Sequence, residues 1–581
     1  MTPTRDETRQ VLRDGAFDVL VIGAGITGAG IALDAAARGL SVAVLDKGDV
    51  ASGTSGWSTK LVHGGVRYLE QYDFPMVREG LHERYTLLQN APYLVRRLGF
   101  LYPVAGGLVA KTFVDTGLWF YDLLAGRRSL GLHHRVDAAT STADAPLRAP
   151  WDRGGFLYYD GQTDDTRLTL TILLSAVERG AVVATYTEVV GFLKDGGRVT
   201  GVRARDALDG GDGAAFEVKA RAVINATGVW MDRLQTLDDP DVDTRVVPSK
   251  GSHIVVPAAR LPIESAVIMP KTSDGRVLFA VPWQGRVVIG TTDAEYTGDL
   301  DCPTATTEDV AYILRHANEY FGINLTENDI VATYAGLRPL IRAGGPDSGG
   351  VSGGQDPGGR DKPGGAETEV NTKDVSRKHI VVTSPSGLVS IGGGKLTTYR
   401  VMAHDAVEAA LKATDLTPPH AANTAHIPLT GTLGYRRLAA RADELATRYS
   451  VTPDVVRHLL GRYGAHATRV LDTIAERPEL TAPLVEGLPY LQAEAIYSAR
   501  HELVTTLEDI LARRTRLLLI DDAHGVDIAE ATARLVAPEL GWDDARIAAE
   551  AARYRDYARR AASGYSHGAG AQADEPAAAA V

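Results

Sequence analysis

The feature of this sequence that most restricts its fold is a glycine-rich turn between an apolar segment and a helical one. Residues 17–22 read as a buried strand, residues 25–38 as a helix and residues 41–45 as a second buried strand. The turn between the first two, residues 23–28, has the pattern G-x-G-x-x-G. This order predicts the first half of a doubly wound α/β sheet of the Rossmann-like kind, which binds a dinucleotide.

The expected ligand of this turn is a pyrophosphate. Backbone N–H groups and the positive end of the helix dipole can meet it where glycines leave the backbone open. Asp46 lies 18 residues past Gly28, where a carboxylate can accept hydrogen bonds from both ribose hydroxyls. The alternative is a tight strand–helix turn without a ligand. The residues expected at the cofactor are Gly23, Ala24, Gly25, Ile26, Thr27, Gly28 and Asp46.

Two later glycine turns bear on which dinucleotide binds. Residues 221–228 form a strand that ends in Ala226, Thr227 and Gly228, and residues 389–395 form another that runs into Gly394 and Lys395. Three such turns suit a cofactor that lies extended across the sheet with a ring system at its far end. A single G-x-G-x-x-G leaves no second dinucleotide site, so a bound flavin needs another electron outlet.

Changes of pattern divide the rest of the chain, whose 581 residues correspond to about three or four domains. Residues 252–257, 276–282 and 286–291 are short and β-rich, which indicates an antiparallel sheet. From about residue 420 the pattern is helical, with an N-cap at Thr452 before Pro453. The second amphipathic stripe there consists of Leu503, Leu507, Ile510 and Leu511.

The expected fold class is therefore α/β, with a doubly wound, Rossmann-like dinucleotide-binding domain, an antiparallel β-sheet domain and a C-terminal helical domain. The glycine-rich insert and the Ala/Gly-rich tail carry too little apolar surface to offset the entropy of ordering. The expected boundaries are a polar N-terminal lead at 1–16, the discontinuous dinucleotide-binding domain at 17–85, 155–235 and 376–415, the antiparallel-sheet domain at 86–154 and 236–343, a disordered insert at 344–370, the helical domain at 420–562 and a disordered tail at 563–581.

Charge and composition exclude several classes of protein. A net charge of −12 argues against a nucleic-acid-binding surface spread over the molecule, and we expect no nucleic-acid partner. Cys302 is the single cysteine, so an internal disulfide is excluded and a reducing compartment, the cytoplasm by default, is favoured. The histidines show no paired metal spacing, so no metal is expected. No window holds the 18 or more uncharged apolar residues of a spanning helix.

Six motifs together resemble one known family, the FAD-dependent, quinone-linked glycerol-3-phosphate dehydrogenases. The similarity covers about residues 15–540, and its motifs lie at residues 21–30, 58–69, 250–255, 289–293, 336–340 and 393–400. The resemblance implies tightly but noncovalently bound FAD, sn-glycerol 3-phosphate as substrate and dihydroxyacetone phosphate as product. It thereby makes the doubly wound domain the FAD-binding domain and the antiparallel-sheet domain the substrate domain. It also implies that electrons pass to membrane quinone, and that the chain is a homodimer attached peripherally to the inner face of the cell membrane.

The same resemblance assigns residues to roles. It points to Arg338 and Arg377 for the substrate phosphate, which suits the paired donors of a guanidinium group. It places Arg67, Tyr68, His253 and Lys395 around the reacting carbinol and the flavin, with His253, Arg338, Lys395 and Arg67 as the catalytic set. It extends the expected cofactor-binding residues to Lys47, Thr54, Ser58, Thr59, Lys60, Val62, Lys395, Leu396 and Thr397.

Proton removal from the substrate hydroxyl has two candidate mechanisms. His253 is the natural base, since an imidazole titrates near neutral pH. The alternative is that a neighbouring arginine stabilises an alkoxide. His63 is expected to pack beside the flavin rather than to act in catalysis.

Residues 98–126 are rich in large apolar side chains and are flanked by Arg96-Arg97 and Arg127-Arg128. The stretch has two interpretations. It lies in a bilayer interface with basic flanks facing anionic lipid, or it is a buried helix of the substrate domain.

Three other functions compete with the dehydrogenase. The first is an oxidase that uses the same flavin and substrate but passes electrons to oxygen. The second is an amine or amino-acid oxidase, which needs a carboxylate-binding pocket that the Arg338 and Lys-Gly-Ser-His motifs do not favour. The third is a non-enzymatic FAD-containing scaffold or RNA-modification partner, which the acidic chain disfavours.

Overall fold

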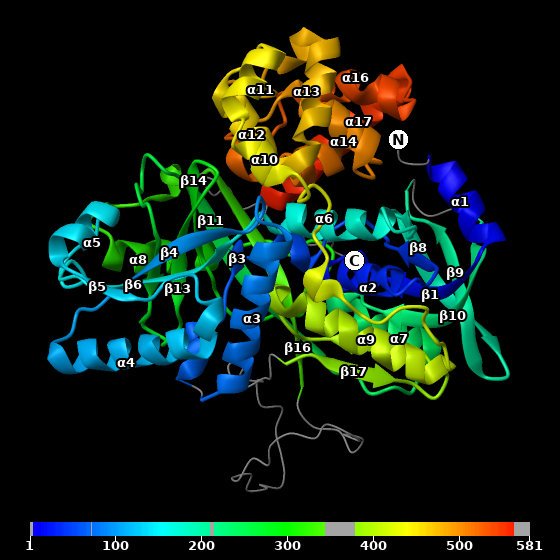
Figure 1. The fold of residues 1–581 in the computed structure, drawn as a ribbon, viewed down its shortest axis with the longest axis horizontal. Coiled ribbons are helices and arrows are strands. Elements are labelled where there is room, and N and C mark those ends of the chain that lie inside the picture. Colours follow the sequence, from blue (N-terminus) through cyan, green and yellow to red (C-terminus); the bar gives the residue numbers. More distant parts are fainter. Residues whose placement is uncertain (1–3, 71, 209–213, 343–377, 563–581) are drawn as a thin grey trace, which may run out of the picture.

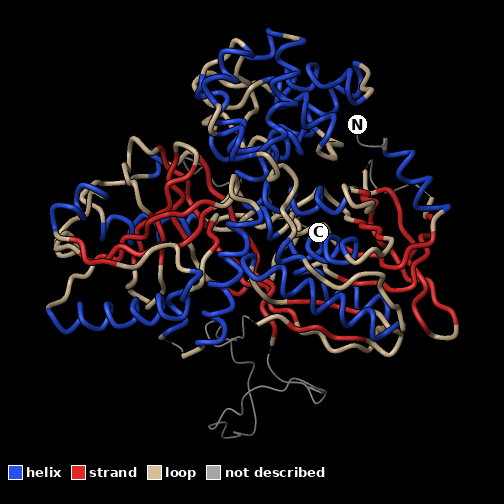
Figure 2. Tube along the Cα trace, viewed as in Figure 1, coloured by secondary structure: helices blue, strands red, loops and turns tan. Residues whose placement is uncertain are grey.

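The computed structural model describes residues 4–70, 72–208, 214–342 and 378–562. Two sheets lie side by side and a helical domain covers them from one side (Figure 1). Figure 2 shows the strands gathered in the two sheets and the helical domain without strands. This arrangement confirms the predicted fold class. The predicted insert and tail lie outside the described residues.

The first sheet has eight strands among the described residues, and its central part is parallel, with β1 between β2 and β10. Strand β1 is buried on both faces, because Val19 and Val21 pack into the core of α2, α6 and α9 while Leu20 and Ile22 face the core beside α1. This explains its unbroken apolar run. The strands are β1 Ala16–Ile22, β2 Val42–Leu45, β7 Val182–Ala184, β8 Thr187–Asp195, β9 Arg198–Asp206, β10 Phe216–Asn225, β17 Ile380–Thr383 and β18 Val389–Gly392.

The helices that accompany this sheet are α1 Arg5–Asp14, α2 Ile26–Ala37, α6 Asp165–Val177, α7 Met231–Asp238 and α9 Tyr399–Thr414. The first of them corrects the prediction of a polar lead at residues 1–16. Thr4 and Glu7 form a capping box, and Leu12 is buried in the core.

The second sheet has ten strands within the described residues, and the order of its main path is β15-β11-β14-β13-β12-β4-β6-β3. Its longest pairing is antiparallel, between β11 and β16. The strands are β3 Leu61–Val62, β4 Arg96–Pro103, β5 His134–Val136, β6 Gly155–Gln162, β11 Val246–Pro257, β12 Ala266–Met269, β13 Leu278–Trp283, β14 Arg286–Gly290, β15 Ala294–Glu295 and β16 Ala332–Ile341. Its helices are α3 Phe74–Asn90, α4 Leu108–Ala125, α5 Ala138–Asp144 and α8 Thr307–Tyr320.

Two predicted domain boundaries differ from this sheet. Strands β3 and β6 pair with each other, and β6 pairs with β4, so both belong to the second sheet. The sequence analysis placed them in the FAD-binding domain, because their short apolar segments do not show which sheet they join.

The apolar stretch at residues 98–126 is not one helix. Strand β4 takes its first part, and α4 buries only Leu118, Tyr121 and Ala125.

The helical domain follows α9 and packs on the second sheet, where Val255, Val288 and Tyr334 belong to its core. Its helices are α10 Tyr435–Ala439, α11 Ala442–Tyr449, α12 Pro453–Tyr463, α13 Ala467–Glu476, α14 Gln492–His501, α15 Leu517–Ile520, α16 Ala529–Leu540 and α17 Asp544–Ala562, with a π-helical turn at Asp509–Arg514. Thr452 caps α12 as predicted. The predicted second stripe is wrong in its start, since Leu503 precedes the helical turn that carries Ile510 and Leu511.

Among the described residues, none of the helices combines the length and the apolar character that crossing a membrane requires.

Candidate active site

A cavity of about 890 Å³ lies between the two sheets and is lined by both. Its volume is within the range of small-molecule and cofactor pockets. Most of the predicted site residues line it. They are Gly23, Gly25, Ile26, Thr27, Asp46, Lys47, Thr54, Ser58, Thr59, Arg67, Tyr68, Ala226, Thr227, Gly228, His253, Arg338, Gly394, Lys395, Leu396 and Thr397.

The turn between β1 and α2 needs glycine at two positions for its own shape. Gly23 has φ +110°, and a Cβ there would lie 2.6 Å from the carbonyl oxygen of Ala226. A Cβ at Gly28 would lie 1.8 Å from the carbonyl oxygen of Gly23. Gly25 is different, because a Cβ there meets only Ser55 Oγ, at 3.1 Å. The backbone at Gly25 is therefore open toward the cavity, as close approach of a pyrophosphate requires.

Asp46 follows the last residue of β2 and lies beside this turn. Its carboxylate accepts hydrogen bonds from the backbone N–H of Ala24, at 2.6 Å, and of Gly48, at 2.8 Å. Desolvation raises the pKa of the Asp46 carboxyl above its ordinary value. The backbone thus holds an acceptor where a ribose would lie, and together with the open Gly25 this fits FAD.

Lys47 lines the cavity and also has two protein partners. Its ammonium forms an ion pair with Asp301 and lies 4.3 Å from the ring centre of Trp230, which also lines the cavity. The sequence reasoning missed Trp230, although it lies two residues past the predicted turn at residues 226–228.

The candidate base and the candidate phosphate ligand lie on neighbouring strands of the second sheet. His253 is on β11 and Arg338 on β16, whose register pairs Ser249 with Arg338 and His253 with Tyr334. Glycines give both side chains room, because a Cβ at Gly251 would lie 2.4 Å from Arg338 Nη2 and a Cβ at Gly290 2.3 Å from His253 Cδ2. The sheet therefore brings together two side chains that are 85 residues apart in the sequence.

His253 is 2% exposed and is held on two sides. Its ring stacks on Tyr334 with centroids 4.5 Å apart, and its Nε2 lies 2.9 Å from Thr59 Oγ1. Burial, with a further contribution from the charge of Arg338, lowers the pKa of His253 well below its ordinary value. The imidazole is consequently neutral at physiological pH, the form that can take up a proton.

Arg338 has partners that fix its guanidinium group at the cavity wall. Nη2 donates to Thr291 Oγ1 at 3.1 Å and to the carbonyl oxygen of Thr292 at 3.2 Å. Nη1 forms an ion pair with Asp293 at 3.4 Å. The side chain remains about a quarter exposed, which leaves room for a ligand anion at the guanidinium group.

The other predicted cations come from two loops that meet. The backbone N–H of His63 donates to Thr397 Oγ1 at 3.2 Å, and Lys395 Nζ lies 3.8 Å from the ring centre of Tyr68. The carbon of the Arg67 guanidinium group lies 6.0 Å from the same ring. His63 lines the cavity as well.

Several predicted residues lie elsewhere. Lys60 does not line the cavity: its ammonium is fully buried against Asp165 Oδ2 at 2.7 Å, and burial lowers its pKa to about 8. Val62, Ala24 and Gly28 also stay behind the cavity wall, Val62 as a core residue of β3. Arg377 lies outside the described residues.

The structure adds one cation to the candidate site. Arg276 lines the cavity and forms an ion pair with Asp274 at 3.1 Å. It belongs to a turn before β13 and to none of the six motifs, so no pattern in the sequence indicated it. Around it the cavity wall is apolar and aromatic, with Phe100, Tyr102, Tyr158, Ile268 and Phe279. Over the described ranges, three or more His, Cys, Asp or Glu never gather as a metal ion would require.

Comparison with known proteins agrees with this geometry. Residues 18–400 match the family model described as FAD dependent oxidoreductase, and residues 422–547 match the C-terminal domain of alpha-glycerophosphate oxidase. A protein of Mycobacterium tuberculosis named glycerol-3-phosphate dehydrogenase 2 is 41% identical over 93% of this chain and 87% of its own length. A mitochondrial glycerol-3-phosphate dehydrogenase of Arabidopsis thaliana is 36% identical over 93% of this chain and 86% of its own length.

A solved structure agrees as well. The glycerol-3-phosphate dehydrogenase of Bacillus halodurans, crystallised with FAD, aligns with a TM-score of 0.76 and 32% identity, over 97% of this chain and 98% of that one.

Proposed function

The chain belongs to the family of FAD-dependent glycerol-3-phosphate dehydrogenases, and on that premise we propose that it oxidises sn-glycerol 3-phosphate to dihydroxyacetone phosphate and passes the electrons to membrane quinone. The observation that carries the proposal is the position of the buried His253 and of Arg338 on neighbouring strands of one sheet, in the same cavity as the glycine-rich turn.

FAD, when bound, supplies the acceptor for the hydride that leaves C2 of the substrate. The residues proposed to hold it are the turn at residues 23–28, Asp46 and the loops at residues 226–228 and 394–397. All four lie at the ends of β1, β2, β10 and β18, where parallel strands present ligands.

The chain's own residues bind the substrate and move one proton. Arg338 offers paired donors to the phosphate dianion, and Arg276 and Lys395 add positive charge in the same cavity. We assign the C2 hydroxyl proton to Nε2 of the neutral His253 imidazole, which Thr59 Oγ1 already approaches. Water is kept away by the aromatic wall around Phe100 and Tyr158. An alkoxide stabilised by arginine stays the alternative to this base.

Helix α4 is the proposed membrane contact. Its exposed apolar side chains include Val109, 85% exposed, Phe113, 68% exposed, and Trp119, 56% exposed. On its buried side, the hydroxyl of Tyr121 accepts from the backbone N–H of Gly64 at 3.0 Å. One face of α4 is thus open to lipid while the other holds the loop that lines the cavity, which supports a short route to quinone and a cytoplasmic protein attached peripherally to the membrane. A homodimer is a further part of this proposal.

The test of the reaction is anaerobic mixing of the protein with glycerol 3-phosphate while flavin absorbance is followed. Bleaching is expected with glycerol 3-phosphate, and much weaker bleaching with glycerol, which lacks the phosphate. Reoxidation by a quinone analogue that is faster than by oxygen supports the dehydrogenase, and the reverse order supports the oxidase. Bleaching by amino acids alone would overturn the assignment.

The membrane contact is tested by flotation with vesicles that contain anionic lipid. Phe113→Asp is expected to reduce the bound fraction, because it places a charge on the apolar face of α4. Leu433→Asp is the matched control, since Leu433 is 78% exposed but lies in the helical domain. Equal binding of both variants would remove α4 from the proposal. Light scattering of the same preparations tests the dimer.

A further inference from the structure

The segment at residues 49–60 joins the end of β2 to β3 and forms one wall of the cavity. Seven of its residues line the cavity, namely Ser52, Gly53, Thr54, Ser55, Trp57, Ser58 and Thr59. We call this segment the cofactor wall. Arginine side chains of the C-terminal helical domain, far away in the sequence, bond it at two places: at Asp49, where it begins, and at Gly56, between residues that line the cavity.

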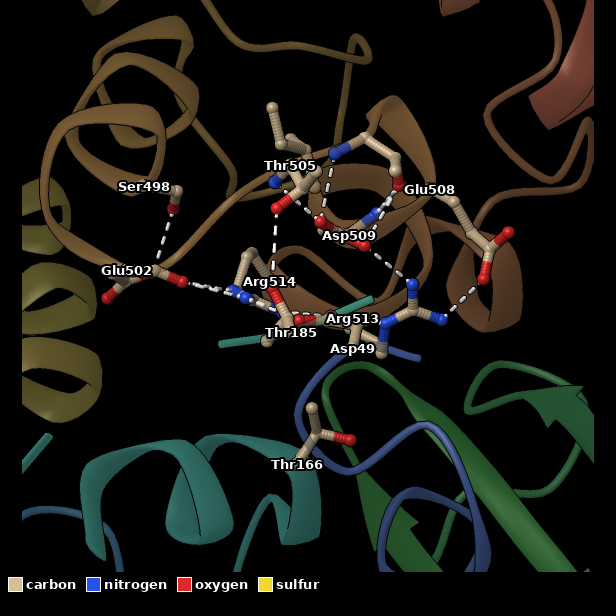
Figure 3. A network of polar contacts seen from close by, with 12 residues as sticks. Asp49, Thr166, Thr185, Ser498, Glu502, Thr505, Glu508, Asp509, Arg513 and Arg514 are labelled. Carbon is tan, nitrogen blue, oxygen red and sulfur yellow. Dashed lines mark hydrogen bonds and ion pairs between the residues drawn. The ribbon is translucent and has the colours of Figure 1, made fainter. Parts of the chain in front are cut away.

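The first end of the cofactor wall is Asp49, which is fully buried. Arg514 binds its carboxylate through two nitrogens, at 2.5 Å and 2.9 Å, and Arg513 Nε adds a third bond at 2.5 Å. Figure 3 shows both guanidinium groups reaching down from the π-helical turn to Asp49. Glu508 and Asp509 bind Arg513 from the other side, so the arginines are themselves held in place.

The second contact is at Gly56, within the cofactor wall, which the guanidinium group of Arg516 reaches. Nη2 of Arg516 donates to the carbonyl oxygen of Gly56 at 2.7 Å, and Nη1 donates to Thr166 Oγ1 at 2.7 Å. Arg516 is fully buried, and Asp165 lies 3.4 Å from it. The same Asp165 accepts from the backbone N–H of Ser58 at 2.9 Å. The helical domain thus fixes the cofactor wall at Asp49, just before the residues that line the cavity, and at Gly56, among them.

The side chains of the cofactor wall contact both the glycine-rich turn and the candidate base. Ser55 Oγ accepts from the backbone N–H of Ile26, at the start of α2, at 2.8 Å. Thr59 Oγ1 lies 2.9 Å from His253 Nε2. The contact of Ser55 positions the glycine-rich turn and the contact of Thr59 positions the candidate base. A displacement of the cofactor wall would therefore displace both. A buried ion pair is weak support for stability, because desolvation of the charges offsets most of their attraction, but it does fix one geometry.

We propose that Arg514 and Arg516 are positioning residues, which hold the cofactor wall in the geometry that retains FAD and aligns Thr59 with His253. The helical domain thereby completes the cofactor site without lining the cavity. FAD binding is a property of the family, so the binding arm of the test is independent of the proposed substrate. The kinetic arm rests on the proposed function.

The experiment compares full-length Arg514→Gln and Arg516→Lys with Arg167→Gln. Arg167 and Glu502 form a buried ion pair at the same boundary between domains, with Nη2 to Oε2 at 3.1 Å, but neither side chain bonds the cofactor wall. Arg167→Gln therefore matches the loss of a buried charge pair. For all variants the FAD dissociation constant, the flavin circular dichroism and the melting temperature are measured.

The expected result is a dissociation constant for FAD raised about tenfold to a hundredfold in the two wall variants, which is the effect that outer-shell partners have in metal sites. Their flavin dichroism should change, and Arg167→Gln should melt earlier yet bind FAD as the unsubstituted chain does. In stopped-flow reduction, the wall variants should also show a displaced acid limb of the pH profile. If glycerol 3-phosphate does not reduce the flavin, the proposed function is wrong, but the dissociation constants for FAD still test the role of Arg514 and Arg516.

Two results would overturn it. One is an FAD affinity within about threefold of that of the unsubstituted chain in both Arg514→Gln and Arg516→Lys. The other is an equal loss of FAD affinity in Arg167→Gln, which would mean that the arginines act only through the stability of the fold. If Arg514→Gln does not accumulate, Thr166→Val removes one acceptor of Arg516 without burying an unpaired carboxylate. Its FAD affinity is then judged by the same criterion.

Discussion

Replacing Gly25 by alanine should weaken FAD binding while leaving the rest of the fold nearly intact. The residue has φ −71° and ψ 179°, which alanine adopts freely, and its new methyl group would meet only Ser55 Oγ. Gly28→Ala is the contrasting change, because its methyl group would overlap the backbone of Gly23 at 1.8 Å. The first variant obstructs the ligand and the second distorts the turn itself.

The expected magnitudes differ accordingly. Gly25 is the N-cap of α2, where alanine in place of glycine costs about 1 kcal/mol of stability. The methyl group keeps a charged phosphate from a backbone donor, and such a hydrogen bond contributes about 1.5–3 kcal/mol. That corresponds to roughly tenfold to 150-fold in affinity. Gly28→Ala overpacks a backbone contact and should cost the apoprotein about 3 kcal/mol or more.

The assay is denaturant unfolding of the three proteins, each freed of flavin, with and without added FAD. At a free FAD concentration of about 100 times the dissociation constant, the unsubstituted chain should gain about 2.7 kcal/mol from the ligand. A variant weakened about a hundredfold gains only about 0.4 kcal/mol at the same concentration. An unchanged gain in Gly25→Ala would refute the placement of the pyrophosphate. An apoprotein of Gly25→Ala as unstable as that of Gly28→Ala would refute the steric argument.

Three further predictions concern the second sheet. Arg338→Ala should lower the efficiency of flavin reduction by glycerol 3-phosphate about thirtyfold or more, because it removes the paired donors of a phosphate dianion; an unchanged efficiency in stopped-flow reduction would assign the phosphate to other cations. His253→Asn should slow the limiting reduction rate on the order of 10²- to 10⁴-fold, and a nearly unchanged rate would remove the histidine from the mechanism. Because the pKa of His253 is lowered in the folded chain, the unfolded chain binds more protons below pH of about 6.5, so the free energy of unfolding should fall as the pH drops below that value. Urea unfolding between pH 5 and 7.5 checks this, and an identical slope in His253→Asn would contradict it.

Local patterns predicted the secondary structure of the expected nucleotide-binding turn. The strand, glycine turn and helix at residues 16–37 follow from the periodicity of apolar residues and from the spacing of three glycines. Both signals depend only on residues that are close together in the sequence. The juxtaposition of His253 and Arg338 came from motifs of a family, because no periodicity relates β11 to β16. Their roles in catalysis stay predictions.

Other features lacked a local signal. Strand β11 begins at Val246, yet the sequence indicated a strand only from residue 252, because Pro248 reads as a breaker. In the sheet Pro248 lies opposite Pro339, so both prolines fall at the same place in the ladder. The partner of Lys60 was missed for a similar reason: Asp165 lies 105 residues away, and an ion pair across domains leaves no pattern in either segment.

The interleaving of the two sheets along the chain has a consequence for biosynthesis. Strand β18, which ends at Gly392, pairs with β10 in the first sheet, and β16 completes the second only shortly before it. At about 5–20 residues per second, a ribosome needs roughly 20 to 80 seconds to reach that point. Until then the edge of β10 that pairs with β18 has no neighbour, and an unpaired strand edge of this kind promotes aggregation. Arg514 and Arg516, which we propose to hold the cofactor wall, are synthesised only after both sheets are complete.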